Sequence, residues 1–171
     1  MGKILVIRGG AIGDFILTLP VLQAIQSFLP ANHVEVLGYP RIAQLAVAGG
    51  LAARVASIES RAMAGFFARR GRLDETLREY FSEFDLIISF LYDPDGIFQE
   101  NVGLCSSAQF IAGPHRPDES QEVHAADCFL KPLERLAIFE PDRFPKLVIE
   151  RTENGAASHL KLALATDSWL A

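Results

Sequence analysis

Short apolar runs alternate with longer amphipathic or apolar patterns along most of the chain. Runs of strand length fall at residues 4–7, 33–39, 54–59, 85–91, 108–113 and 145–150. Helical patterns fill residues 14–29, 41–49, 63–70, 74–84 and 123–138 between them. Short Val-, Ile- and Leu-rich runs are typical of strands buried on both faces. The alternation therefore predicts an α/β fold, a parallel sheet with helices on both faces.

The end of the chain departs from this alternation. Residues 154–171 read as a helix and a turn, and another apolar segment then starts at Trp169. We expect a first domain over residues 1–153, and a linker helix with the start of a further domain over residues 154–171. A frayed natural C-terminus is the alternative.

Composition and charge narrow the class of protein. The chain has 171 residues and is 50% hydrophobic, which suits one domain with a full core. A net charge of −5 argues against a general nucleic-acid binder, which needs a basic surface. Cys105 and Cys128 match no metal or redox spacing, so we expect two free thiols. No apolar run reaches the length of a membrane span, and we predict a cytoplasmic protein, with peripheral membrane contact left open.

The turn between the first strand and the first helix is the main candidate site. It reads "RGGAIGD" over residues 8–14, and the carboxyl ends of parallel strands form the ligand-binding edge of such sheets. Gly9 and Gly10 allow a sharp turn, and Gly13 allows close approach of a ligand. The order departs from the G-x-G-x-x-G fingerprint, and no Walker lysine is present. NAD or ATP binding through this loop is therefore disfavoured.

Asp14 has two compatible interpretations. Aspartate is a favoured helix N-cap and is stabilised there by the helix dipole. A carboxylate at the mouth of a cleft could also accept a proton from an alcohol that it holds in hydrogen-bonding reach. Arg8, at the end of the first strand, could orient Asp14 or a bound ligand, or fill a polar pocket.

Residues 3–30 resemble the opening of the family 9 glycosyltransferases, the ADP-heptose:lipopolysaccharide heptosyltransferases. The matching motifs are "IGD" at 12–14, "TLPVL" at 18–22 and "FLP" at 28–30. Weaker similarities follow in "FDLIISF", "FIAG" and "VHAADCFLKPLERLAI". The resemblance spans nearly the whole chain, but its specific motifs lie in the first thirty residues.

The resemblance implies the N-terminal half of a GT-B fold, a Rossmann-like domain that binds the acceptor sugar. Asp14 would be the catalytic base of an inverting transfer, and Arg8, Gly10, Ala11 and Gly13 would contact the acceptor. The acceptor would be a lipopolysaccharide-type glycolipid. A C-terminal domain outside this chain would bind the nucleotide-sugar donor, of the ADP-heptose type. No cofactor and no metal are expected.

Asp93-Pro94-Asp95 is a literal D-x-D sequence. In a different structural class of glycosyltransferases such a pair holds a divalent metal on the nucleotide diphosphate. The same residues followed by Gly96 are also a plain turn signal. Because the strand–glycine–helix pattern does not suit that metal site, we predict a turn.

Basic residues and one histidine complete the candidate site. Arg69, Arg70 and Arg72 lie in "ARRGR", which is either a solvated loop or, by the resemblance, a loop that grips phosphate or carboxylate groups of the acceptor. Such a loop could also approach an anionic membrane surface. His124 is either a structural residue at a helix start or a further acceptor contact.

Two other functions stay open from the sequence. One is a Rossmann-like module that binds a nucleotide or a flavin, although the missing fingerprint counts against it. The other is a non-catalytic interaction domain with the same half fold.

Overall fold

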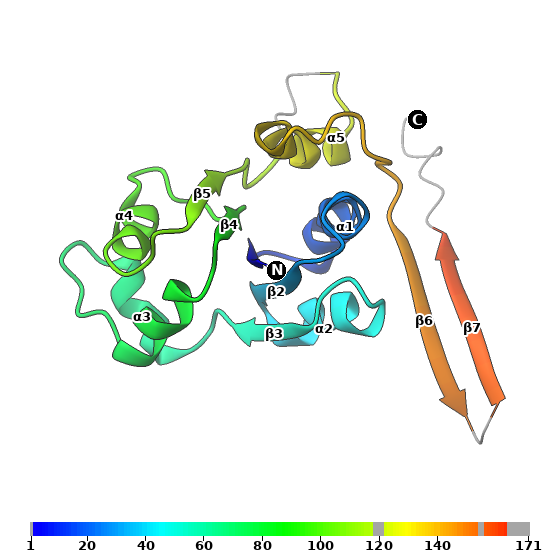
Figure 1. The fold of residues 1–171 in the computed structure, drawn as a ribbon, viewed down its shortest axis with the longest axis horizontal. Helices are drawn as coiled ribbons and strands as arrows, with labels where there is room; N and C mark the ends of the chain where they lie inside the picture. Colours follow the sequence, from blue (N-terminus) through cyan, green and yellow to red (C-terminus); the bar gives the residue numbers. More distant parts are fainter. Residues whose placement is uncertain (1, 118–121, 154–155, 164–171) are drawn as a thin grey trace.

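The computed structural model describes residues 2–117, 122–153 and 156–163. Five parallel strands form one sheet in the order β3-β2-β1-β4-β5 (Figure 1). The strands are β1 (Lys3–Arg8), β2 (His33–Gly38), β3 (Arg54–Ser57), β4 (Leu86–Ser89) and β5 (Gln109–Ala112). The parallel α/β fold that the sequence predicts is confirmed.

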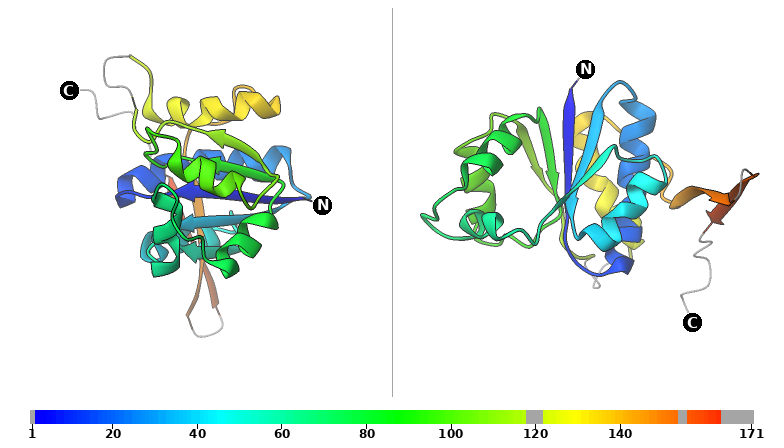
Figure 2. Two further views of the ribbon diagram at one scale, coloured as in Figure 1. Left: turned by 90° about the vertical axis from the view of Figure 1, so that its left-hand side faces the viewer. Right: turned by 90° about the horizontal axis from the view of Figure 1, so that it is seen from below.

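Helices cover both faces of this sheet (Figures 1 and 2). One face packs against α1 (Ile12–Phe28), α2 (Pro40–Ala48), α5 (Ala125–Leu130) and the 3-10 helix η2 (Lys131–Leu136). The other face packs against the 3-10 helix η1 (Arg61–Phe67), α3 (Glu75–Ser82) and α4 (Ile97–Gly103). The predicted three-layer arrangement is therefore present.

Strand β1 supplies both cores because successive side chains of a strand point to opposite faces. Ile4 and Val6 belong to the core under α1, α2 and α5. Leu5 and Ile7 belong to the second core, which is rich in phenylalanine: Phe66, Phe81, Phe84 and Phe98. A strand buried on both faces reads as a continuous apolar run, which explains why the sequence predicts it clearly.

Two prolines act differently on their helices. Helix α1 runs through Pro20 without restarting, and Pro20 is buried between the core residues Leu19 and Val21. The predicted helix at 123–138 instead divides into α5 and η2 at Pro132. Proline disfavours α-helical geometry in the residue before it. Pro132 is buried as well, and there the chain changes to 3-10 geometry.

The C-terminal part differs from the prediction. Strands β6 (Lys146–Glu153) and β7 (Ala156–Ala163) pair antiparallel in a sheet of their own. The helix expected within residues 154–171 is therefore wrong for Ala156–Ala163, while residues 154–155 and 164–171 lie outside the described part. The letters "HLKLA" alternate with the two-residue period of a strand, a signal that the helix prediction overlooked.

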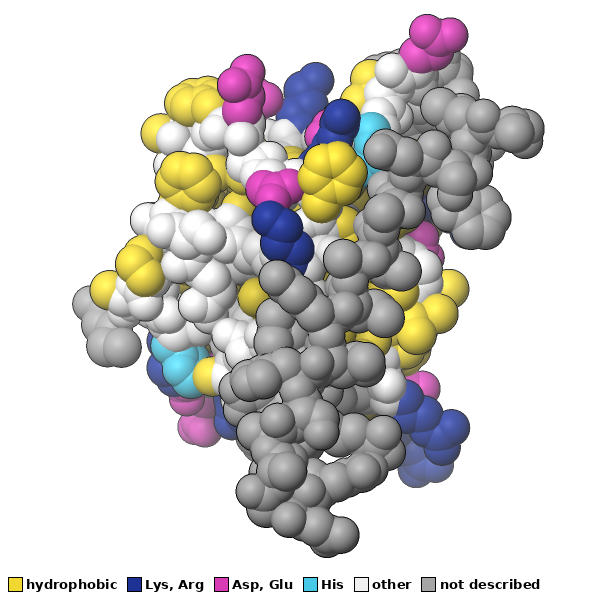
Figure 3. Space-filling model, turned by 90° about the vertical axis from the view of Figure 1, so that its right-hand side faces the viewer, with side chains coloured by type: hydrophobic (Ala, Val, Ile, Leu, Met, Phe, Trp, Pro, Cys, Tyr) yellow, Lys and Arg dark blue, Asp and Glu magenta, His cyan; other side chains and the backbone are white. Residues whose placement is uncertain are grey.

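The start of this hairpin is attached to the main domain. The Lys146 amide donates to Gln23 Oε1 of α1 over 3.1 Å, and Leu147 is buried in the core. Gly49, after α2, makes room for it, because a Cβ there would lie 2.3 Å from Leu147 Cδ1. Figure 3 views the hairpin side, where described side chains of both charges and hydrophobic groups are interspersed.

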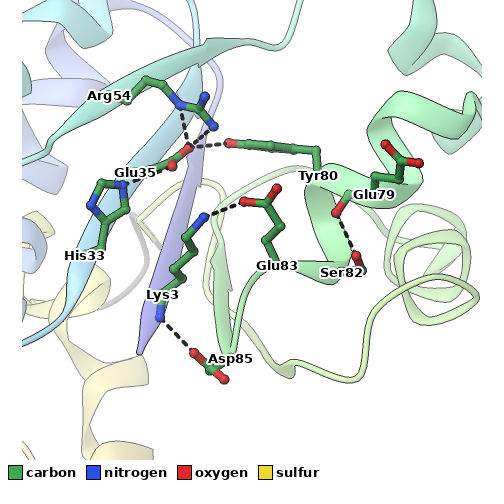
Figure 4. Close-up of polar contacts among 9 residues, drawn as sticks. All are labelled: Lys3, His33, Glu35, Arg54, Glu79, Tyr80, Ser82, Glu83 and Asp85. Atoms are coloured by element: carbon green, nitrogen blue, oxygen red, sulfur yellow. Dashed lines mark hydrogen bonds and ion pairs between the residues drawn. The ribbon is translucent and has the colours of Figure 1, made fainter. Parts of the chain in front are cut away.

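A buried carboxylate joins β2, β3 and α3 at the amino-terminal end of the sheet (Figure 4). Glu35 is 2% exposed, and its Oε2 accepts hydrogen bonds from Arg54 Nη2 at 2.8 Å and the Tyr80 hydroxyl at 3.2 Å. Its Oε1 lies 3.1 Å from His33 Nε2. Both carboxylate oxygens are thus satisfied, and the cluster lies far from the strand carboxyl ends. We assign it a structural role.

Replacing Glu35 by glutamine should lower the free energy of unfolding by about 1.5–3 kcal/mol, because the charged acceptor of several hydrogen bonds is lost. Urea denaturation of Glu35→Gln measures this. The control is Asp127→Asn, which alters the exposed Arg143–Asp127 pair and should cost at most about 1 kcal/mol. Equal losses in both variants would contradict the structural role of Glu35.

Tyr80 should make stability depend on alkaline pH. Burial raises the pKa of the Tyr80 hydroxyl above its usual value, and the charge of Glu35 adds to the effect. The folded chain therefore keeps a proton that the unfolded chain loses above about pH 10. This contribution is complete below that pH and declines above it, by up to about 1.4 kcal/mol per pH unit.

The variant Tyr80→Phe should lose this component of the pH dependence. Urea denaturation at several values between about pH 8 and 11 measures it, since a free tyrosine titrates near pH 10. The control Tyr92→Phe, at an exposed tyrosine, should keep the wild-type slope. The same slope in all three proteins would show that Tyr80 does not carry the effect.

Candidate functional site

A pocket of about 420 Å³ opens at the carboxyl ends of the strands. The end of β1 and the segments that follow all five strands contribute to its lining. These residues are Arg8, Gly9, Gly10 and Asp14 near β1, Tyr39 after β2, Glu59 after β3, Tyr92 after β4, and His115 and Arg116 after β5. Strand β1 lies between β2 and β4. The chain adds β2 and β3 on one side of β1, and then adds β4 and β5 on the other side. That switch point is where parallel α/β sheets bind ligands.

Gly10 shapes the turn that carries Asp14. Its φ of 100° is one that other residues rarely adopt, and a Cβ at this position would lie 2.7 Å from Asp14 Oδ2. The turn lets the carboxylate fold back, so that Asp14 Oδ2 accepts a hydrogen bond from the Ala11 amide at 3.1 Å. Beside Gly13 the space that a Cβ would occupy is empty. A ligand could therefore approach the start of α1 closely there.

Asp14 lies inside the first turn of α1, and Ala11 is the N-cap residue. The predicted cap position of Asp14 is therefore wrong, because the helix starts at Ile12, two residues earlier than expected. The carboxylate still stands at the positive end of the helix dipole. Its side chain is 36% exposed and lines the pocket, so it is accessible to a ligand.

Arg8 is a buried cation beneath this carboxylate. The residue is 3% exposed, and its Nη1 donates to the backbone oxygens of Phe90 at 3.3 Å and His115 at 3.0 Å. Its guanidinium lies 4.6 Å from the ring centroid of Phe129, and its Nη2 lies 3.5 Å from Asp14 Oδ1. Burial lowers the pKa of Arg8, and the charge of Asp14 opposes this change. The sequence left open whether Arg8 orients Asp14 or a ligand, or fills a polar pocket. The structure shows a contact between Arg8 and Asp14.

Exposed aromatic rings surround the mouth of the pocket. Tyr39, Phe67 and Tyr92 all line it, and Tyr92 is 69% exposed. The ring of Tyr92 lies 4.5 Å from that of His115, centroid to centroid. The sequence did not predict the following lining residues: Tyr39, Glu59, Tyr92, His115 and Arg116. Their position directly after strands was the signal that could have found them, since those segments converge at one edge.

The basic loop lies apart from the pocket lining. Arg69 and Arg70 are exposed in the turn after η1, two and three residues beyond the pocket residue Phe67. Arg72 and Arg61 line a second hollow, of about 580 Å³, together with Asp74 and Glu75. The acidic neighbours make this hollow mixed in charge.

The other predicted positions have local roles in the structure. His124 is the N-cap of α5, and its Nδ1 accepts a hydrogen bond from the Ala126 amide at 3.2 Å. It is not among the residues that line the pocket, and a contact with the acceptor stays a prediction. Ala11 and Gly13 are exposed at the start of α1.

The D-x-D sequence forms a turn, as predicted. The Asp93 backbone oxygen accepts from the Gly96 amide, and its carboxylate accepts from the amides of Phe98 and Gln99 at the start of α4. In the described part of the chain, no three His, Cys, Asp or Glu side chains lie close enough to hold a metal ion. Cys105 and Cys128 are free thiols, as predicted. None of the described helices is long and apolar enough to cross a membrane.

Several solved structures with a similar fold are glycosyltransferases. A glycosyl transferase family 9 protein from Veillonella parvula superposes with a TM-score of 0.61 at 17% identity, over 89% of this chain and 46% of that one. The E. coli heptosyltransferase WaaC, solved with ADP-2-deoxy-2-fluoro heptose, gives a TM-score of 0.53 at 16% identity, over 82% of this chain and 50% of that one. The chain shares the fold of half a glycosyltransferase.

The same enzyme solved with ADP gives a TM-score of 0.52 at 15% identity, over 82% of this chain and 48% of that one. This chain thus spans about half the length of the transferases that it matches. The sequence matches no family model and no curated protein.

Gly10→Ala should destabilise the chain by about 1–3 kcal/mol through backbone strain, and by more through the clash with the Asp14 carboxylate. The matched control is Gly50→Ala. Gly50 also has a positive φ, of 68°, but open space surrounds its Cβ position. Urea denaturation compares the two, and a Gly10→Ala cost no larger than that of Gly50→Ala would contradict the close contact with Asp14.

Proposed function

We propose that this chain is the acceptor-binding domain of an inverting glycosyltransferase similar to family 9. The observation that supports it most is the Asp14 carboxylate, exposed at the start of α1 on the wall of the strand-end pocket. The fold that this chain shares with glycosyltransferases also supports the proposal. The proposed reaction moves a heptose-like sugar from a nucleotide-sugar to a lipopolysaccharide-type acceptor.

In the proposed mechanism Asp14 is the general base. An acceptor hydroxyl donates a hydrogen bond to the carboxylate, and its oxygen attacks the anomeric carbon of the donor sugar. The new C–O bond forms on the face opposite the bond that breaks, and the nucleoside diphosphate leaves with that bond's electrons. The hydroxyl proton passes to Asp14. This requires a base within hydrogen-bonding distance of the hydroxyl, at a fixed position.

Two contacts keep the base in place. The Ala11 amide donates to Asp14 Oδ2, and the Arg8 guanidinium lies 3.5 Å from Oδ1. Since Arg8 is itself held by two backbone oxygens, the carboxylate has little freedom to rotate away. The open space beside Gly13, at the start of α1, leaves room for part of the acceptor.

The lining of the pocket suits a sugar that carries an acid group. Arg116 is exposed at the rim and can form paired hydrogen bonds with a carboxylate or a phosphate. Tyr39 and Glu59 add groups that can bond sugar hydroxyls. We propose that Arg69, Arg70 and Arg72 bind acidic groups of the same acceptor farther out, or approach an anionic membrane surface in the cytoplasm.

The donor would be bound elsewhere. The chain corresponds to about half of each matched transferase, and its glycine turn already holds Asp14 where a phosphate would lie. We therefore propose that a second domain, outside these 171 residues, binds the nucleotide-sugar.

Calorimetry with ADP should then show little or no binding to this chain. Tight stoichiometric binding would favour a nucleotide-binding module instead.

In the enzyme with its donor domain, Asp14→Asn should lower the turnover number about 10²–10⁴-fold, the usual contribution of a general base. Asparagine keeps an oxygen for the Ala11 amide, so the fold should be unchanged. Initial rates of transfer from ADP-heptose to a deacylated lipopolysaccharide core measure this.

The matched control is Asp95→Asn, at an exposed carboxylate in the turn before α4, which should keep wild-type turnover. Near-normal turnover in Asp14→Asn would reject Asp14 as the base, and no transfer by the wild-type enzyme would reject the proposed reaction.

A further inference from the structure

We propose that the ring of Tyr92, with the ring of His115 tilted by 53° beside it, is a platform on which a second, neutral sugar ring stacks, so that the ligand is a disaccharide with its acid group on the ring beside Asp14. The proposal rests on the proposed function, because it takes the strand-end pocket as a saccharide site. It assigns Tyr92 as the residue that selects a disaccharide over a single sugar.

Two neighbouring pockets share the platform residues. The strand-end pocket and a smaller pocket of about 230 Å³ are both lined by Leu91, Tyr92 and His115. A ligand that occupies both pockets therefore contacts these residues. The smaller pocket alone is below the usual size of ligand sites, about 300–1,000 Å³, which suits an extension of the first.

Tyr92 and Leu104 are the most exposed large hydrophobic residues of the described chain. The Tyr92 side chain is 69% exposed and belongs to neither hydrophobic core, and its aromatic neighbour is His115. Tyrosine offers a large apolar face with few rotatable bonds, so covering it with a ligand costs little conformational entropy. The apolar C–H face of a sugar ring is a suitable cover.

The platform and the catalytic carboxylate share one anchor. Arg8 Nη1 donates to the backbone oxygen of His115 at 3.0 Å, and Arg8 Nη2 lies 3.5 Å from Asp14 Oδ1. A single buried side chain therefore fixes the position of the platform relative to the base. The two rings of a disaccharide therefore have defined positions, one on the platform and the other beside Asp14.

The charges of the two pockets differ, and this sets the chemistry of each ring. Arg116 is the exposed cation of the strand-end pocket, whereas Arg8 is buried and faces Asp14, so an acid group of the first ring belongs at Arg116, away from the carboxylates of Asp14 and Glu59. The smaller pocket is lined by Ser89, Asp93 and Gln99 but by no arginine or lysine among the described residues. A second acid group would meet Asp93 without a balancing cation. The second ring is therefore neutral, with hydroxyls for these polar groups.

NMR titration of the 171-residue chain tests this with three saccharides. They are glucuronic acid, the disaccharide of glucuronic acid and glucose, and digalacturonic acid. The mixed disaccharide should bind roughly fivefold to tenfold more tightly than glucuronic acid, as one aromatic contact allows. Digalacturonic acid should show no such gain.

Variants separate stacking from other contacts. Tyr92→Ala should remove the gain, so that glucuronic acid and the mixed disaccharide bind with similar Kd values, whereas Tyr92→Phe should retain the gain. The control Phe139→Ala alters a ring that is 63% exposed and lies outside both pockets, so it should have no effect.

Equal affinities for glucuronic acid and the mixed disaccharide, or a gain that survives Tyr92→Ala, would overturn the platform alone. Binding of digalacturonic acid with the same gain would overturn the neutral second ring. If no saccharide shifts the resonances of Gly10 and Asp14, the platform and the proposed function fail together.

Discussion

The strand-end edge of this protein depends on the buried guanidinium of Arg8. Burying a charge is costly unless polar groups or opposite charges surround it. Here two backbone oxygens from separate loops, the ring of Phe129 and the carboxylate of Asp14 meet that requirement. The loops after β4 and β5 and the start of α1 are thereby fixed to the end of β1. Four of the residues proposed to act on a ligand lie on these segments: Asp14, Tyr92, His115 and Arg116.

A buried charge lies at each end of the sheet, and the surroundings of the two charges differ. At the amino-terminal end, Glu35 has hydrogen-bond partners for both oxygens (Figure 4). At the carboxyl end, Arg8 donates to two backbone oxygens and faces the carboxylate of Asp14, which lines a pocket. The buried charge at the amino-terminal end is thus enclosed by hydrogen-bonded side chains, whereas the one at the carboxyl end lies beside a pocket.

The sequence predicts β1 and β4 well because they are apolar runs buried on both faces, a pattern that does not depend on distant residues. Asp14 is marked by the glycine turn that precedes it, which is also a local pattern. The site's other members depend on contacts across the chain. His115 meets Arg8 over 107 positions, and no local pattern marks such a pair. The strand at Ala156–Ala163 was misread because its alternation is short and its residues also suit a helix.

The arrangement around Asp14 explains how an acidic residue can occupy a loop type that commonly holds phosphates. Phosphate sites use free amides at a helix N-terminus. In this chain the Ala11 amide already donates to Asp14, and Gly10 leaves the space that the carboxylate needs. The chain thus supplies its own anion to the helix terminus. A second anion would be repelled there, whereas a neutral hydroxyl can approach and donate its proton, which is the property that an acceptor site requires.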